Sequence, residues 1–335
     1  MREYRMRCVP IGLIIVGCLF PQSFLVAQES EAAPPVPRFV LGLPGLENGR
    51  AIRELAAQPE AWAECRKQCD LLLYADHVLN RQFPDDAELV ALLGRFREMK
   101  LPLQLEVGAV KPWGPTGEKT FQVQKPLWDR FLRCGAMIHG IAMDEPLNCC
   151  RNHLKKDAEY AAGQTADFIA RVRRDFPEWS VGDIEGFPSL QADEVIAWID
   201  LLEAKLRARN VRGLDFFRLD CDWMHFVRNT GRGSWQDFLR IERHCRQRKI
   251  AFSVVYWPAN YPALGRQGLA DDRAWFVGTV GMVHDHLLSG GRPDQVVVQS
   301  WVDGPKTFLP ETEPFSMTAT ARTVQDIINN NSLQQ

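Results

Sequence analysis

Short apolar runs alternate with longer amphipathic stretches from residue 38 onward. Eight runs have the length and the β-branched, leucine or aromatic content of buried strands: 39–43, 71–75, 101–107, 138–143, 180–184, 214–219, 250–256 and 296–301. Between most of them, apolar residues recur at helical spacing with charges on the opposite face, most clearly at 86–100, 158–174, 192–209 and 234–248. A last helix is expected over 316–329, with Ser316 as its N-cap.

Two architectures share this alternation of strands and helices: the closed (β/α)8 barrel and the open doubly wound sheet. The open sheet usually has a glycine-rich phosphate loop, G-x-G-x-x-G, after its first strand. Here the first strand runs into Leu43-Pro44-Gly45-Leu46-Glu47-Asn48-Gly49, which lacks that pattern. The sequence therefore predicts α/β architecture with a single (β/α)8 TIM barrel over residues 38–335.

The N-terminal segment has the anatomy of an export signal. Arg2, Arg5 and Arg7 precede an apolar stretch that ends in Leu25-Val26-Ala27, which resembles a cleavage site. We predict a signal peptide over residues 1–27, a Pro/Ala-rich linker over 28–37, and a periplasmic or extracellular location. Ile15-Val16-Gly17-Cys18 also resembles a lipobox, so lipid anchoring through Cys18 is an open alternative.

Composition narrows the classes of partner. The chain has 335 residues, 40 basic and 42 acidic, with a net charge of −2. This balance argues against a nucleic-acid binder that relies on excess positive charge, and no membrane span is expected beyond the signal. Seven cysteines follow the signal, an odd number without zinc-site spacing, and we expect buried free thiols with at most one disulfide: Cys65, Cys69, Cys134, Cys149, Cys150, Cys221 and Cys245.

Acidic residues follow many of the predicted strands. In a TIM barrel the C-terminal strand ends form the catalytic face, and five strands deliver carboxylates there: Glu106, Asp144 and Glu145, Asp183 and Glu185, Asp220 and Asp222, and Asp303. Alternation places Asp183 with Glu185 on one face, and Arg218 with Asp220 and Asp222 on another. Any single acid could instead cap a helix, but five similar strand ends favour a functional site.

Aromatic residues accompany these acids: Trp113, Trp223, Tyr256, Trp257 and Trp301 follow or end strands. Carboxylates beside flat aromatic faces suit a carbohydrate, because hydroxyls bind acids and the C–H face of a sugar packs on an indole. The alternative for each tryptophan is ordinary core packing.

Asp144-Glu145-Pro146 resembles the Asn-Glu-Pro motif of retaining TIM-barrel glycoside hydrolases, and Trp301 is similar to their sugar-binding tryptophan. The resemblance implies that Glu145 is the general acid/base. It breaks at the seventh strand, where that family has its nucleophilic Glu and this chain has Val255-Tyr256-Trp257-Pro258-Ala259-Asn260. A second carboxylate must come from another strand, with Asp220, Asp222 or Glu185 as candidates, or the protein is not such an enzyme; a pair about 6.5–9.5 Å apart would favour inversion.

The sequence thus predicts a secreted glycoside hydrolase without a cofactor. Glu145 is the expected acid, its pKa raised by Asp144 or Asp183, and Asp222 or Glu185 is the expected base. The expected substrate contacts are Glu106, Asp144, Asp183, Asp220, Trp257 and Trp301.

Two other functions stay open at this stage. The first is a metal-dependent barrel isomerase or hydrolase, with acids holding Mg²⁺ or Mn²⁺ and His77, His225 or His284-Asp285-His286 nearby. The second is a carbohydrate-binding barrel without catalysis.

Overall fold

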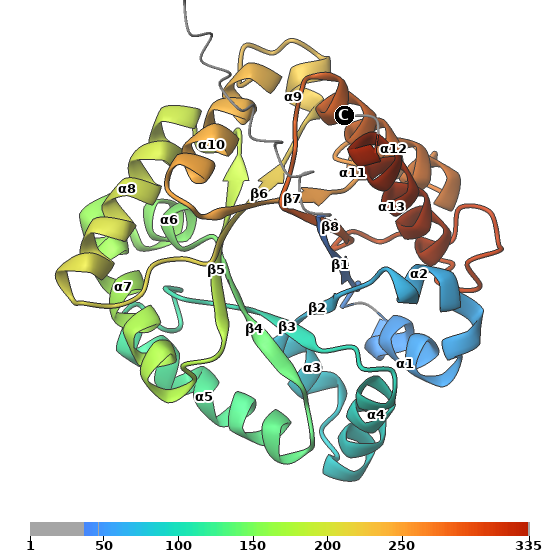
Figure 1. The fold of residues 1–335 in the computed structure, drawn as a ribbon, viewed down its shortest axis with the longest axis horizontal. Coiled ribbons are helices and arrows are strands. Elements are labelled where there is room, and N and C mark those ends of the chain that lie inside the picture. The colour runs from blue at the N-terminus through green and yellow to red at the C-terminus, as the bar shows by residue number, and fades with distance from the viewer. Residues whose placement is uncertain (1–36, 46, 334–335) are drawn as a thin grey trace, which may run out of the picture. The chain divides into compact units, whose positions relative to one another are not determined.

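Eight parallel strands close into a barrel in chain order in the computed structural model, which describes residues 37–45 and 47–333 (Figure 1). The strand β1 (Arg38–Gly42) pairs with β8 (Gln295–Gln299), and this pairing closes the ring. The strands between them are β2 (Leu71–Ala75), β3 (Leu103–Val107), β4 (Ile138–Asp144), β5 (Ser180–Phe187), β6 (Phe216–Cys221) and β7 (Ala251–Tyr256). The predicted (β/α)8 barrel is confirmed.

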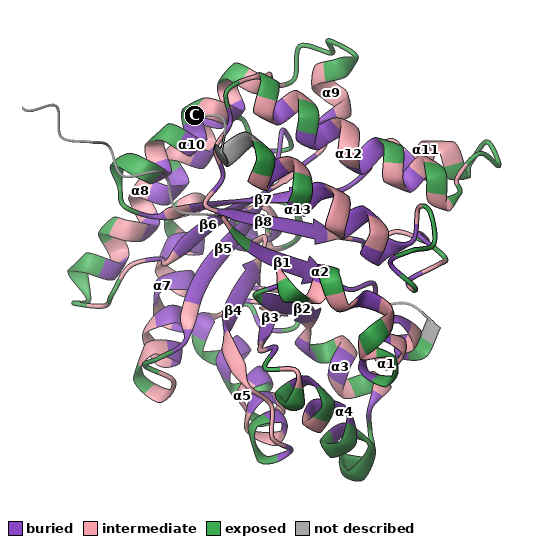
Figure 2. Cartoon of the chain, turned by 45° about the vertical axis from the view of Figure 1, so that its right-hand side comes forward, coloured by how far each residue is buried: buried purple, intermediate pink, exposed green. Residues whose placement is uncertain are grey.

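Helices surround the barrel and bury the face that each turns toward the strands (Figures 1 and 2). Each of the four clearest predicted helices is present within a few residues of its expected bounds. Ser316 caps the last helix, as predicted, by accepting from the Ala319 N–H at 3.1 Å. The helices are α1 (Arg50–Ala57), α2 (Ala63–Lys67), α3 (Asp76–Gln82), α4 (Asp86–Glu98), α5 (Gly117–Arg133), α6 (Pro146–Cys149), α7 (Ala158–Asp175), α8 (Ala192–Ala208), α9 (Met224–Val227), α10 (Trp235–Gln247), α11 (Tyr261–Gly265), α12 (Asp272–Leu288) and α13 (Met317–Leu333).

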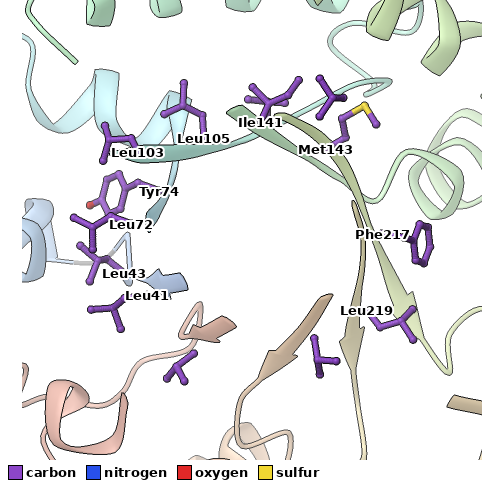
Figure 3. Close-up of a cluster of buried hydrophobic side chains, with 14 of the residues drawn as sticks. Leu41, Leu43, Leu72, Tyr74, Leu103, Leu105, Ile141, Met143, Phe217 and Leu219 are labelled. Carbon is purple, nitrogen blue, oxygen red and sulfur yellow. The ribbon is translucent and has the colours of Figure 1, made fainter. Parts of the chain in front are cut away.

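Each strand presents alternate residues to the barrel axis and to the helices. The helix-facing side chains form the main apolar core, and Figure 3 shows Leu72, Leu105, Met143 and Leu219 among those pointing away from the axis. A separate, smaller cluster fills the barrel interior: Val40, Leu71, Leu73, Ala142, Ile184, Phe216, Val255, Trp257 and Val297. Residues of each strand that share a face with the interior cluster can therefore reach the mouth of the barrel, and those in the main core cannot.

A buried arginine lies among the interior side chains. Arg218 is fully buried, and its guanidinium donates to Gln104 Oε1 at 2.7 Å and to Ser253 Oγ at 2.9 Å. Burial lowers the pKa of Arg218, and the charge of Glu106 opposes that effect. The predicted interaction of Arg218 with the acids is therefore a charge–charge attraction to Glu106 without a hydrogen bond. The hydrogen bonds of the guanidinium go to neutral side chains.

Parts of the sequence prediction concern residues that the structure does not describe. The signal peptide over 1–27, the lipobox with Cys18, and residues 28–36 of the linker lie outside the described residues. The seven cysteines within residues 37–45 and 47–333 are all buried and free, as predicted. In this same part of the chain, no helix has both the length and the apolar character that crossing a membrane requires.

The barrel interior is packed tightly enough at β5 to test the strand orientation. A Cβ added to Gly182 would lie 2.2 Å from the ring of Phe216, whereas one added to Gly163 in α7 would meet nothing within 4 Å. We expect Gly182→Ala to destabilise the fold by about 1–3 kcal/mol through overpacking. Gly163→Ala, the matched control, should be neutral or stabilise by up to about 1 kcal/mol. Urea unfolding of both variants measures this, and equal stabilities would show that Phe216 does not fill the space beside Gly182.

Candidate functional site

A cavity of about 360 Å³ opens where the strands end at the C-terminal face of the barrel. We call it the central cavity. Three strands supply its four carboxylates: Glu106 from β3, Asp144 and Glu145 from the end of β4, and Asp220 from β6. The remaining lining residues are Ile184, Val255, Gln299 and Trp301. The structure thus brings together five of the nine predicted site residues.

Glu145 reaches this cavity through an unusual backbone conformation. Its φ of 44° places it in the left-handed region, which costs a non-glycine residue on the order of 1–3 kcal/mol. Its N–H donates to Ile184 O at 2.9 Å, and its C=O accepts from Cys149 N at 2.9 Å, so α6 begins directly after it. Gly186 leaves room for the carboxyl group, because a Cβ there would lie 2.6 Å from Glu145 Oε1.

The surroundings of Glu145 favour its protonated form. Burial raises the pKa of Glu145, and the negative charge of Asp144 adds to that effect. Asn148 works in the opposite direction, since its Nδ2 donates to Glu145 Oε2 at 2.7 Å and stabilises the carboxylate. The expected repulsion from Asp144 is therefore present but ranks behind burial.

Asp220 is half-buried in the wall of the central cavity. Burial raises its pKa well above the usual value, and the charge of Glu145 raises it further. The nearby indole of Trp257 lowers the pKa of Asp220, but this effect is smaller than that of burial. Asp220 therefore resists ionisation most when Glu145 is charged.

Each of the other two acids contacts one polar side chain. Lys111 Nζ lies 2.5 Å from Asp144 Oδ2, and this ion pair outweighs burial to raise the pKa of Lys111. Gln299 Nε2 donates to Glu106 Oε2 at 2.9 Å. Burial and the charge of Asp144 nevertheless raise the pKa of Glu106. Sequence reasoning missed Lys111 and Gln299 as site residues.

Two tryptophans form an aromatic wall at the cavity. The ring centroids of Trp257 and Trp301 lie 4.4 Å apart with the planes at 49°. Trp257 is buried in the barrel-interior cluster, while Trp301 is 40% exposed and lines the central cavity. Trp301 is thus the member of the pair that offers its face to a ligand.

Asp183 and Glu185 do not lie at the central cavity, and the expectation that they face the mouth is wrong. They share a face of β5, as alternation requires, but that face turns to the helices, while Ile184 faces the axis. Asp183 Oδ2 accepts from Trp198 Nε1 of α8 at 2.6 Å. Burial raises the pKa of both acids well above the usual value.

Glu185 instead holds the helix that follows Glu145. Its Oε1 accepts from Leu147 N at 2.6 Å, and its Oε2 accepts from Asn148 N at 3.3 Å. These N–H groups belong to the first turn of α6, where helical partners are missing. Asn148 in turn contacts Glu145, so Glu185 acts on the cavity only through this short helix.

Asp222 is also placed differently from the expectation that it serves as a base in the cleft. It follows the end of β6 and is not among the residues that line the central cavity. Its side chain is 46% exposed, and its Oδ2 lies 3.7 Å from His225 Nε2. Asp303, from the fifth acidic strand end, is 81% exposed and pairs with Lys306.

The histidines singled out as metal ligands are dispersed. His77 is 70% exposed beside Asp76, and His286 is buried between Tyr256 and Glu242. Among residues 37–45 and 47–333, no group of three or more His, Cys, Asp or Glu side chains is arranged to hold a metal ion.

Comparison with known proteins identifies the fold. No protein-family model matches the sequence, and a search of curated proteins finds no match. A thermostable mutant of a xylanase from Cellvibrio japonicus aligns with a TM-score of 0.52 at 11% identity, over 87% of this chain and 97% of that chain. A D-psicose 3-epimerase gives 0.46 at 14% identity (87% and 97%), and an aldo/keto reductase from Brucella melitensis gives 0.45 at 11% (88% and 95%). The xylanase alignment, at 11% identity, shows a shared TIM-barrel fold alone.

The raised pKa of Asp220 makes a prediction about stability. The folded state holds the Asp220 proton more tightly than the unfolded state, so its contribution to stability falls as pH rises from about 4 toward the folded pKa. We expect Asp220→Asn to raise the melting temperature by at least about 2 °C at pH 7, and the gain to shrink toward pH 4.

The exposed Asp303 provides the control, because Asp303→Asn should melt like the wild type throughout this pH range. Thermal melts of the three proteins between pH 4 and pH 8 measure the effect. An Asp220→Asn gain that is independent of pH would contradict the burial of a titrating carboxyl group.

Proposed function

We propose that this protein is an exported glycoside hydrolase that uses Glu145 as its general acid and Asp220 as its second carboxylate. One observation supports this more than any other. Glu145 and Asp220 line the same cavity at the catalytic face of a TIM barrel, together with the half-exposed Trp301. Export is inferred from the sequence of residues 1–27.

Glu145 is suited to give a proton to the leaving oxygen. Its raised pKa keeps the proton in place at a pH where an ordinary Glu has lost it. As the glycosidic C–O bond breaks, the proton passes to the departing oxygen and Glu145 becomes a carboxylate. The Asn148 amide then stabilises the new charge through its 2.7 Å hydrogen bond.

Asp220 takes the place of the carboxylate that strand seven lacks. After β7 the chain continues with Trp257, which contributes an indole and no acid. In its ionised form Asp220 could either accept a proton from a water or attack the anomeric carbon. The aspartate also supplies negative charge against the oxocarbenium character of the transition state, in a recess where electrostatic effects are stronger than in water.

The remaining groups orient the sugar. Glu106, Asp144 and Gln299 offer acceptors and an amide to hydroxyl groups, and the face of Trp301 suits the C–H surface of a sugar ring. Lys111 holds Asp144 in place and balances part of the negative charge in the cavity. The substrate-binding role thus falls to the cavity groups that are not assigned to proton transfer.

The acid role of Glu145 is tested by changing how much protonation the leaving group needs. Glu145→Gln keeps the size of the side chain but removes the proton. We expect activity on a methyl glycoside to fall by about 10²–10⁴-fold, and activity on a 4-nitrophenyl glycoside of the same sugar to fall much less.

The measurement is kcat/KM for both substrates on both proteins, with the melting temperature as a control for folding. Equal losses on the two substrates, or no loss on either, would remove Glu145 from the acid role. A carbohydrate-binding barrel without catalysis would instead bind sugars without cleaving either substrate.

A further inference from the structure

A second cavity, of about 450 Å³, adjoins the central one. We call it the side cavity. Glu106 and Asp144 line both, so the two spaces meet at these carboxylates. The outer walls of the side cavity come from the end of β3, the loop after it and α5, and they are formed by Val107, Trp113, Val123 and Leu127.

The two cavities differ in chemistry. Carboxylates and an amide dominate the central cavity, whereas aliphatic and aromatic side chains dominate the outer walls of the side cavity. Trp113 is 50% exposed and Val123 is 43% exposed. Single exposed apolar residues are ordinary, but here two of them line one concave space next to a candidate active site.

The indole of Trp113 is held in position by its loop. Backbone hydrogen bonds join Lys111 and Gly114 in both directions, at 3.0 and 2.9 Å. The indole packs where Gly108 has no side chain, since a Cβ there would lie 2.9 Å from Trp113 Cζ2. Gln124 fixes the Gly108 backbone through both of its amide atoms. The aromatic face is therefore ordered before a ligand arrives.

Most polar groups of the side cavity are already engaged. Gln124 is committed to Gly108, and Lys111 is paired with Asp144. The buried Asp76 accepts from an indole N–H at 2.9 Å and from a backbone N–H at 2.5 Å. Apart from Glu106, Asp144 and the exposed His77, a second sugar ring would find few partners for its hydroxyl groups here, whereas a flat apolar group would need none.

We propose that the substrate is a glycoside with a flat, apolar aglycone, which binds against Trp113 in the side cavity while the sugar occupies the central cavity. The proposal rests on the glycosidase function proposed above and names its substrate class. An apolar group on the anomeric oxygen would pass from the central cavity into the side cavity at Glu106 and Asp144, which line both. The Trp113 face and the aliphatic walls then recognise the aglycone by stacking and burial.

The test measures binding rather than turnover. Calorimetric titration of the Glu145→Gln protein uses phenyl and methyl glycosides of glucose, galactose, mannose and xylose in both anomeric forms. For the sugar that binds, we expect the phenyl glycoside to bind about five- to tenfold more tightly than the methyl glycoside. Adding Trp113→Ala should remove most of that preference, and Trp113→Phe should retain it.

Trp301→Ala, also in the Glu145→Gln background, is the matched control. Trp301 lines the central cavity and is exposed to a similar extent, so its loss should weaken both glycosides and leave their ratio unchanged. A preference that survives Trp113→Ala overturns the aglycone site but leaves the proposed hydrolase standing. If a disaccharide also binds more tightly than the methyl glycoside, and Trp113→Ala reduces that gain in affinity more than it reduces the gain from the phenyl group, the side cavity binds a second sugar and the proposal is overturned. If no glycoside of the panel binds, the proposed function fails, and the aglycone site fails with it.

Discussion

The orientation of each strand in the closed barrel decides which side chains reach the cavity at the C-terminal face. A residue faces either the axis or the helices, and its two neighbours face the other way. On β5 the axis side is Gly182, Ile184 and Gly186, while Asp183 and Glu185 face the helices. The space above Gly186 admits the carboxyl group of Glu145, and Glu185 holds α6 from behind. One strand thereby shapes the cavity with one face and supports its neighbour with the other.

The second constraint is the cost of gathering acids in a recess. Burial raises the pKa of Glu106, Glu145 and Asp220, and the charge of Asp144 raises all three further. The positive charges of Lys111 and Arg218 offset part of the repulsion among these carboxylates. What remains is a site that binds protons more tightly than free carboxyl groups do. This property destabilises the fold at neutral pH and equips the cavity for proton transfer.

Much of this architecture could be predicted from the sequence. The eight strands, their order, and the acids that end β3, β4 and β6 followed from periodicity and from the known location of barrel chemistry. The orientation of β5 could not be predicted, because both faces of a barrel strand are buried and alternation does not say which faces the axis. The paired glycines at 182 and 186 were the available signal. Lys111 and Gln299 were missed because an isolated lysine in a loop and a glutamine at a strand end have no characteristic spacing.

The pH dependence of kcat/KM tests the central claim most directly, namely that Glu145 and Asp220 act as one acid and one base. The account predicts a bell-shaped profile for the wild type, because the reactive form carries a proton on Glu145 and none on Asp220, although the pKa of Asp220 is the more strongly raised of the two. Glu145→Gln should lose the alkaline limb, and Asp220→Asn should lose the acidic limb in the activity that remains. Variants that both retain the complete bell would contradict the assignment of these two carboxyl groups.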